Sequence, residues 1–183
     1  MNIRTEGFMK KDVARLTGIR ASNIQFYTDQ GIVVPEVDAP SGKGTRRKYS
    51  KHNLLQILIA KKLVEHGVPL GDVRGILDGF DDWCRQHIDL AEDQLRNVPS
   101  GEKKRISEKA RVGKMLLQAE SWDSGSLDSI FVWIHRGEGM SRIGVLHLGE
   151  EKRDFQSDEK IGGDTTSFLI LNITDLVEKV TKL

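Results

Sequence analysis

A basic segment, Gly42-Lys43-Gly44-Thr45-Arg46-Arg47-Lys48-Tyr49, lies between two patterns of paired short helices in the first third of the chain. Its glycines allow a tight turn, so the segment predicts a hairpin that projects its cations from the helices around it. The other strand of that hairpin is expected at Ile32-Val33-Val34-Pro35, because β-branched residues favour strands and proline tolerates a sheet edge. A cationic hairpin held by a small helical core predicts binding to duplex DNA.

Before the hairpin, the sequence predicts a helix-turn-helix. Apolar residues at spacings of three and four favour a first helix that begins near Met9 and is closed by Gly18. A second helix is expected to begin after Ile19, with Ser22 or Asn23 near its start, and to end at Gly31 in a left-handed conformation. The side chains expected to point inward from this helix are Ile24, Phe26 and Tyr27.

After the hairpin, a second pair of helices is expected. Ser50 is the predicted N-cap of a helix that continues to about Glu65, with a buried stripe formed by Leu54, Leu55, Leu58, Ile59 and Leu63. His66-Gly67-Val68-Pro69 should break this helix. A short helix then carries apolar residues inward and is expected to end at Asp78-Gly79, its inward residues being Leu70, Val73, Ile76 and Leu77.

The chain beyond Gly79 has a different pattern. Apolar residues at every third or fourth position from Phe80 to Val98 predict a helix with one narrow seam, as used for helix pairing. The candidate dimerisation residues on this seam are Cys84, Ile88, Ala91 and Leu95. A second amphipathic helix, residues 102–120, is the alternative place for the seam. Three strand-like stretches (129–135, 142–148 and 167–173) and a terminal helix from Thr174 follow.

The expected fold class is therefore α+β, with three parts. Residues 1–79 form a mainly helical winged helix-turn-helix domain, and residues 80–120 form a helical dimerisation or linker region. Residues 121–183 form a small C-terminal α+β domain with about three strands, expected to be an effector or interaction domain.

The charge is distributed unevenly between these parts. The whole chain has a net charge of +1, yet residues 1–79 contain 13 Lys and Arg against 8 Asp and Glu, and the rest contains 15 against 19. This asymmetry favours a polyanionic partner for the first part. No apolar run approaches the ~18 residues that span a bilayer, so no membrane association is expected. A single cysteine and no secretory signal predict a cytoplasmic protein.

The order of these elements resembles the MerR family of bacterial transcription regulators over about residues 8–80. The family's arginine that usually contacts the phosphate backbone is replaced by Gln25, so the resemblance implies a weaker backbone contact there. The likeness is carried by Lys11-Asp12-Val13-Ala14-Arg15-Leu16-Thr17-Gly18-Ile19, by Ile24-Gln25-Phe26-Tyr27 with Gly31-Ile32, by Pro35 with Arg46-Arg47-Lys48-Tyr49-Ser50, and by Leu63-Val64-Glu65-His66-Gly67-Val68-Pro69-Leu70 with Val73 and Leu77.

The candidate DNA contacts combine the start of the second helix with the hairpin. Asn and Gln can pair with adenine and Arg with guanine, while hairpin cations can neutralise phosphates. The position of Tyr27 in the resemblance implies a hydrogen bond from its hydroxyl to a phosphate. The alternatives are a solvated charge run, helix capping by Ser22 or Asn23, and a purely packed Tyr27 ring. The full candidate set is Arg20, Ser22, Asn23, Gln25, Tyr27, Lys43, Arg46, Arg47, Lys48 and Tyr49.

Neither a catalytic site nor a cofactor or metal is expected. Cys84 and His87 could combine into four ligands across a dimer, but we favour Cys84 as a small buried hydrophobe. His135 and His147 have no Ser, Cys or paired carboxylate placed to assist them, so structural roles are favoured.

The sequence thus predicts a homodimeric, sequence-specific transcription regulator, not an enzyme. The resemblance implies that it binds and distorts promoter DNA for RNA polymerase. A small-molecule effector would bind the C-terminal domain, where Trp122, Phe131, Trp133 and Phe168 would line an apolar pocket or simply fill a core. The alternative function is a ligand-independent architectural DNA-binding protein whose C-terminal domain is a protein-interaction or oligomerisation module.

Overall fold

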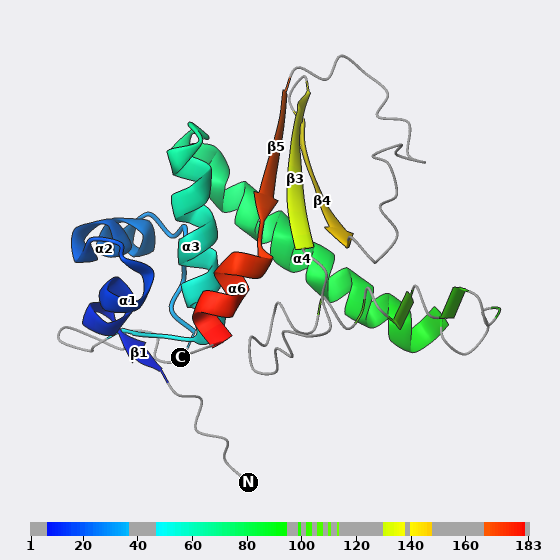
Figure 1. The fold of residues 1–183 in the computed structure, drawn as a ribbon, viewed down its shortest axis with the longest axis horizontal. Helices are drawn as coiled ribbons and strands as arrows, with labels where there is room; N and C mark the ends of the chain where they lie inside the picture. The colour runs from blue at the N-terminus through cyan, green and yellow to red at the C-terminus, as the bar shows by residue number, and fades with distance from the viewer. Residues whose placement is uncertain are drawn as a thin grey trace, which may run out of the picture.

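The computed structural model shows a group of helices packed together and two small sheets (Figure 1). The helices are α1 (Lys10–Thr17), α2 (Ala21–Asp29), α3 (Lys51–Glu65), α4 (Leu70–Gln94) and α6 (Thr174–Thr181). The strands are β1 (Phe8–Met9), β2 (Lys48–Tyr49), β3 (Ile130–Gly137), β4 (Met140–His147) and β5 (Ser167–Asn172). The structure describes residues 7–36, 47–94, 99, 102–103, 106–107, 110, 113, 130–137, 140–147 and 167–181.

The predicted helix-turn-helix is formed by α1 and α2. Gly18 (φ 67°) and Gly31 (φ 64°) are left-handed, which confirms both predicted helix ends. The predicted start of α2 after Ile19 is confirmed, and its N-cap residue is Arg20, which makes no side-chain cap hydrogen bond. Ser22 and Asn23 therefore lie inside the first turn, with exposed side chains, and do not cap the helix.

The partner strand of the wing differs from the prediction. β2 pairs antiparallel with β1, so that Phe8 faces Tyr49 and Met9 faces Lys48, while Ile32-Val33-Val34 forms no strand. The backbone N–H groups of Ile32 and Val33 instead donate to the Tyr27 carbonyl oxygen, at 2.8 and 3.2 Å. Because these donors close the end of α2, they are not available for a sheet ladder.

Helix α3 is buried on nearly every face. The predicted N-cap is confirmed: Ser50 Oγ accepts a hydrogen bond from Asn53 N at 3.0 Å, and Asn53 Oδ1 accepts one from Ser50 N at 3.1 Å. The predicted apolar stripe is also confirmed, but burial extends to every residue from His52 to Ala60. A helix buried all round needs cover on several sides, and α1, α4 and α6 all pack against α3.

Helix α4 runs without interruption through the predicted break at Asp78-Gly79. The short helix and the pairing helix expected from the sequence are thus one 25-residue element. Ile76, Leu77 and Phe80 are buried on both sides of the glycine, so packing holds the helix together across it. Glycine costs a helix only about 1 kcal/mol, which such burial readily exceeds.

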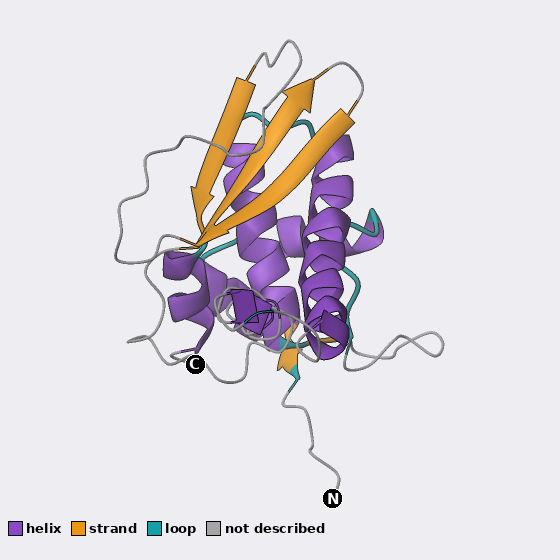
Figure 2. Ribbon diagram, turned by 90° about the vertical axis from the view of Figure 1, so that its right-hand side faces the viewer, coloured by secondary structure: helices purple, strands orange, loops and turns teal. Residues whose placement is uncertain are grey.

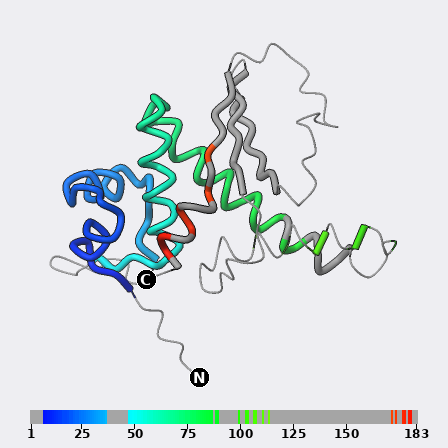
Figure 3. The backbone as a smooth tube through the Cα atoms, viewed as in Figure 1, coloured from blue at the N-terminus to red at the C-terminus, as the bar shows by residue number. Residues whose placement is uncertain are grey.

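The later strands form an antiparallel sheet of order β4-β3-β5, in which Trp133 faces Gly144 on one side and Ile170 on the other. The sheet lies beside the helices, with β4 next to α4 (Figure 2). After β5 the trace returns through α6 to α3 (Figure 3). Residues from this return share one hydrophobic core with the first helices: Leu171, Ile173, Leu176, Val177 and Val180.

Candidate nucleic-acid interface

The exposed face of α2 carries several of the predicted base-reading residues. Arg20, Ser22 and Asn23 are all exposed. The prediction that Phe26 points inward is wrong, since 46% of it is exposed, whereas Ile24 and Tyr27 are buried as expected. The helix spacing of three and four separates these two faces.

Gln25 is half-buried and bonded on both ends of its amide. Lys10 Nζ donates to Gln25 Oε1 at 2.9 Å, and Gln25 Nε2 donates to the two carboxylate oxygens of Asp29 at 2.7 and 2.8 Å. The residue that replaces the family arginine therefore links α1 to the end of α2. A phosphate that accepted a hydrogen bond from Gln25 Nε2 would compete with Asp29 for this donor.

Asp29 connects this link to the wing. Its Oδ1 atom accepts a hydrogen bond from Arg47 Nη1 at 2.8 Å, just before β2 begins. The bonds from Arg47 and then from Gln25 lower the pKa of the Asp29 carboxyl, so it stays ionised. The result is a continuous polar network, Lys10–Gln25–Asp29–Arg47, that joins α1, α2 and the wing. Sequence reasoning missed Asp29, whose only local signal is its position four residues after Gln25.

Tyr27 and Tyr49, both predicted DNA contacts, are buried in the hydrophobic core. Burial, and next the charge of Glu65, raise the pKa of Tyr27, so its hydroxyl keeps its proton. Tyr49 is fully buried, with its hydroxyl 2.9 Å from Thr28 Oγ1. Thr28 Oγ1 donates its own proton to the Ile24 carbonyl oxygen, so Tyr49 is the donor to Thr28. The DNA contact by Tyr49 stays a prediction, and the full burial of this side chain argues against it.

The wing is only partly described. Arg47 is 31% exposed at its side chain and Lys48 is half-buried on β2. The predicted contacts Lys43 and Arg46 lie outside the described residues.

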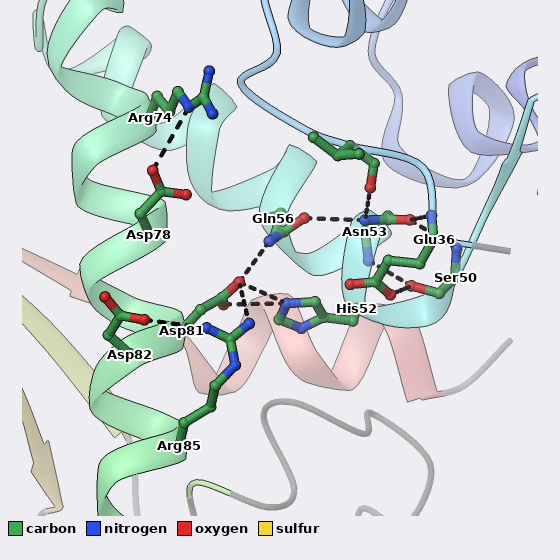
Figure 4. Close-up of polar contacts among 11 residues, drawn as sticks. Glu36, Ser50, His52, Asn53, Gln56, Arg74, Asp78, Asp81, Asp82 and Arg85 are labelled. Atoms are coloured by element: carbon green, nitrogen blue, oxygen red, sulfur yellow. Dashed lines mark hydrogen bonds and ion pairs between the residues drawn. The ribbon is translucent and has the colours of Figure 1, made fainter. Parts of the chain in front are cut away.

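Asn53 forms hydrogen bonds to the backbone on both sides of residues 37–46, the segment that contains the wing (Figure 4). Its Oδ1 atom accepts hydrogen bonds from the backbone N–H groups of Glu36, at 3.0 Å, and Ser50, at 3.1 Å. Its Nδ2 atom donates to the Val34 carbonyl oxygen at 2.9 Å. Ser50 Oγ also donates to the Glu36 carboxylate. One buried amide thus brings together the chain positions before and after residues 37–46. The capping-box spacing of Ser50 and Asn53 was the available sequence signal.

The same network continues into α4 (Figure 4). Asn53 Nδ2 donates to Gln56 Oε1 at 3.1 Å, and Gln56 Nε2 donates to Asp81 Oδ2 at 2.9 Å. His52 Nε2 lies 3.1 Å from Asp81 Oδ1, and Arg85 lies at the outer edge, 3.9 Å from Oδ2. Polar contacts therefore run without a gap from the base of the wing to the middle of the long helix.

The predicted dimerisation residues lie in or beyond the second half of α4. Cys84 is fully buried within its own chain, where a Cβ atom on Gly113 would come within 2.7 Å of its carbonyl oxygen. Burial, and next the Asp81 charge, raise the pKa of the Cys84 thiol. Ile88 is half-buried, Ala91 lies within α4, and Leu95 is outside the described residues. Their role in a dimer stays a prediction.

Within the described ranges, no three His, Cys, Asp or Glu residues lie together in a way that could hold a metal ion. Of the helices that the structure describes, none has the length and apolar character needed to cross a bilayer.

Comparison with known proteins places this interface in a family. Residues 8–79 match the model of the MerR HTH family regulatory protein. An HTH-type transcriptional regulator of Mycobacterium tuberculosis is 26% identical over 72 residues, which are 39% of this chain and 32% of that relative. The HTH-type transcriptional regulator CueR of Salmonella typhi is 26% identical over 110 residues, 60% of this chain and 78% of the relative.

The chain thus spans about a third of the mycobacterial relative and most of the Salmonella one. The match falls on α1 to α4, where the helix-turn-helix, the wing strands and the buried α3 have been described. Residues 8–79 are a helix-turn-helix domain of the MerR family of transcription regulators.

Proposed function

We propose that this protein is a sequence-specific, DNA-binding transcription regulator that acts in the bacterial cytoplasm. The observation that carries the proposal is the shared face of α2 and the wing: Ser22, Gln25 and Asp29 recur at helical spacing, and Asp29 bonds to Arg47. Hydrogen-bonding side chains suited to base edges thereby stand next to a cation suited to phosphate. The regulators named among the relatives support a regulatory function rather than an enzymatic one.

In this proposal, α2 enters the major groove with its exposed start. Arg20, Ser22 and Asn23 contact base edges there, as recognition helices of this motif do with their N-terminal residues. The wing cations Arg46, Arg47 and Lys43 contact the phosphate backbone or the adjacent minor groove. Tyr27 supports α2 from beneath through its packed ring.

We further propose that two chains act together as a homodimer, each reading one half of a roughly palindromic site. Since Phe80 and Cys84 are engaged in the chain's own core, the pairing surface would start at Ile88 and continue through Ala91 and Leu95. Ile88→Glu should then dissociate the dimer in analytical ultracentrifugation. A dimer of unchanged stability would place the seam elsewhere.

Control by an effector is the last part of the proposal. A small molecule bound to the C-terminal α+β domain would act through α6 and β4, which contact α3 and α4, and alter how the dimer distorts promoter DNA for RNA polymerase. The packing of α6 into the core of the first helices favours a second candidate, in which the C-terminal part completes the fold and offers a protein-interaction surface without a ligand. A ligand-induced rise in melting temperature would distinguish the effector domain from the interaction module.

The test of DNA binding is footprinting on genomic upstream DNA at two salt concentrations. We expect a protected site with two-fold symmetry whose occupancy falls steeply with salt. Arg46→Ala and Arg47→Ala together should weaken binding to every sequence and flatten the salt dependence, whereas Lys179→Ala on the exposed face of α6 should change neither. Absence of protection at low salt would refute the proposal.

A further inference from the structure

Asp29 presents an acidic group on the surface that would face DNA. It lies at the end of α2, and its carboxylate accepts hydrogen bonds from two residues of the proposed interface, Gln25 and Arg47. Carboxylate and phosphate oxygens are both anionic acceptors that arginine binds through charge-assisted hydrogen bonds. The Asp29 carboxylate and a DNA phosphate are therefore alternative acceptors for the Arg47 guanidinium.

The contact is placed where DNA could replace it. The side chain of Asp29 is 49% exposed and that of Arg47 is 31% exposed, so neither is sealed in the core. Exposed ion pairs are weak because water and salt screen them, so a dense line of phosphates can compete for the arginine. A deeply buried pair could not exchange in this way.

The exchange also leaves a charge behind. When Arg47 turns to a phosphate, the Asp29 carboxylate loses its cation while it stands close to the polyanion. The Gln25 amide still donates to it, but an amide does not neutralise its charge. Like charges repel, so this carboxylate opposes binding in the complex as well as in the free protein.

We infer that Asp29 is an internal competitor for DNA phosphate, which holds Arg47 and Gln25 in the unbound protein and lowers the affinity for duplex DNA. It is a positioning residue that acts through Arg47, and the inference rests on the proposed DNA-binding function. Since non-specific binding consists almost entirely of phosphate contacts, Asp29 suppresses it and leaves sequence selection to α2.

Fluorescence anisotropy with a mixed-sequence duplex of about 30 base pairs tests this without knowledge of the operator. Asp29→Asn should bind about two- to tenfold more tightly at low salt, because it removes the competing charge and keeps the side-chain shape. The slope of log K against log salt should become steeper by about one per chain, since one more cation is released without replacement. The melting temperature of the free protein should change little, because the residue is exposed.

Asp82→Asn is the matched control. Asp82 is also exposed and also pairs with an arginine, Arg85 at 3.1 Å, but it lies on α4. This variant reports the general effect of removing one negative charge. In an Arg47→Ala background, Asp29→Asn should have no larger effect than Asp82→Asn, because the competition needs Arg47.

The outcomes separate the inference from the function on which it rests. If the wild type binds duplex DNA in a salt-dependent way, and Asp29→Asn matches Asp82→Asn or binds more weakly than the wild type, the inference is overturned while the proposed function stands. If the wild type and all variants fail to bind at low salt, the proposed function is refuted and the inference with it.

Discussion

His52 Nε2 lies 3.1 Å from Oδ1 and 3.2 Å from Oδ2 of Asp81, with both side chains buried between α3 and α4. Asp81 also accepts a hydrogen bond from Gln56, so the carboxylate fixes two polar residues of a helix that is otherwise surrounded by apolar side chains. Polar groups at this depth are tolerated only while they have partners. The pair therefore determines how α4 is seated on α3.

Asp81→Ala should destabilise the protein by about 1–3 kcal/mol, since it removes a buried acceptor from Gln56 Nε2 and the carboxylate beside His52 Nε2. Urea denaturation followed by circular dichroism measures the free energy of unfolding. Asp82→Ala is the control: this neighbouring side chain is 77% exposed, and its loss should change stability by no more than about 0.5 kcal/mol. Equal effects of the two variants would show that the buried contact does not seat α4.

Alanine substitutions at Gly31 and Gly75 should change the free energy of unfolding in opposite directions. Gly31 has a φ of 64°, and a Cβ atom there would lie 3.1 Å from Arg74 Nη1, so Gly31→Ala should cost about 1–2 kcal/mol. Gly75 lies in α4, where a Cβ atom would meet nothing within 4 Å, so Gly75→Ala should stabilise by about 0.5–1 kcal/mol. Thermal unfolding of both variants checks this. A stabilising Gly31→Ala would contradict the left-handed turn.

Leu176→Ala tests the contribution of α6 to the core. Leu176 is buried together with side chains of the first helices, so the substitution should lower the free energy of unfolding by about 2–5 kcal/mol. Lys179→Ala, on the exposed side of the same helix, should have little effect. If Leu176→Ala left the unfolding of the helix-turn-helix domain unchanged, α6 would not be part of its core.

The Cys84 thiol should be protected in the native protein. It is fully buried, and burial together with the Asp81 charge raises its pKa, so little reactive thiolate forms near neutral pH. Modification by a thiol reagent should be at least about a hundredfold slower than in urea-unfolded protein. Equal rates in the two states would contradict its burial.

The raised pKa of the Cys84 thiol also makes the stability of the protein depend on pH. Above pH ~8.5 the unfolded chain loses this proton while the native state retains it. The contribution of Cys84 to stability is therefore complete below that pH and decreases as the pH rises. A Cys84→Ala variant should lack this part of the alkaline destabilisation, as urea titrations at pH 7 and pH 10 can measure.

The features that could be predicted from the sequence are those with local causes. Ser50 caps α3 through a residue three positions away, and Gly18 and Gly31 end helices through their own backbone freedom. The pairing of Phe8 with Tyr49 has no comparable signal, because the two strands are short and far apart in the chain. The β-branched side chain of Ile32 favours a strand. Its backbone N–H instead donates to the Tyr27 carbonyl oxygen, and the sequence carries no signal for this hydrogen bond.

The candidate interface follows the same division. The exposure of Arg20 and Asn23 could be predicted from helical spacing. The burial of Tyr49 and the capture of Arg47 by Asp29 could not, because both depend on how β2 approaches α2. The sequence identifies Arg47 as a candidate phosphate-binding cation. Only the fold shows that Asp29 is its partner within the protein.

The docking of α6 on α3 has a consequence for synthesis on the ribosome. More than a hundred residues separate the two helices in the chain. At about 5–20 residues per second, α3 emerges on the order of ten seconds before the helix that covers it. During that interval the nascent domain presents an uncovered apolar face, which is the kind of surface that chaperones bind. A ribosome that stalled between β4 and β5 would therefore hold a regulator domain whose core could not yet close.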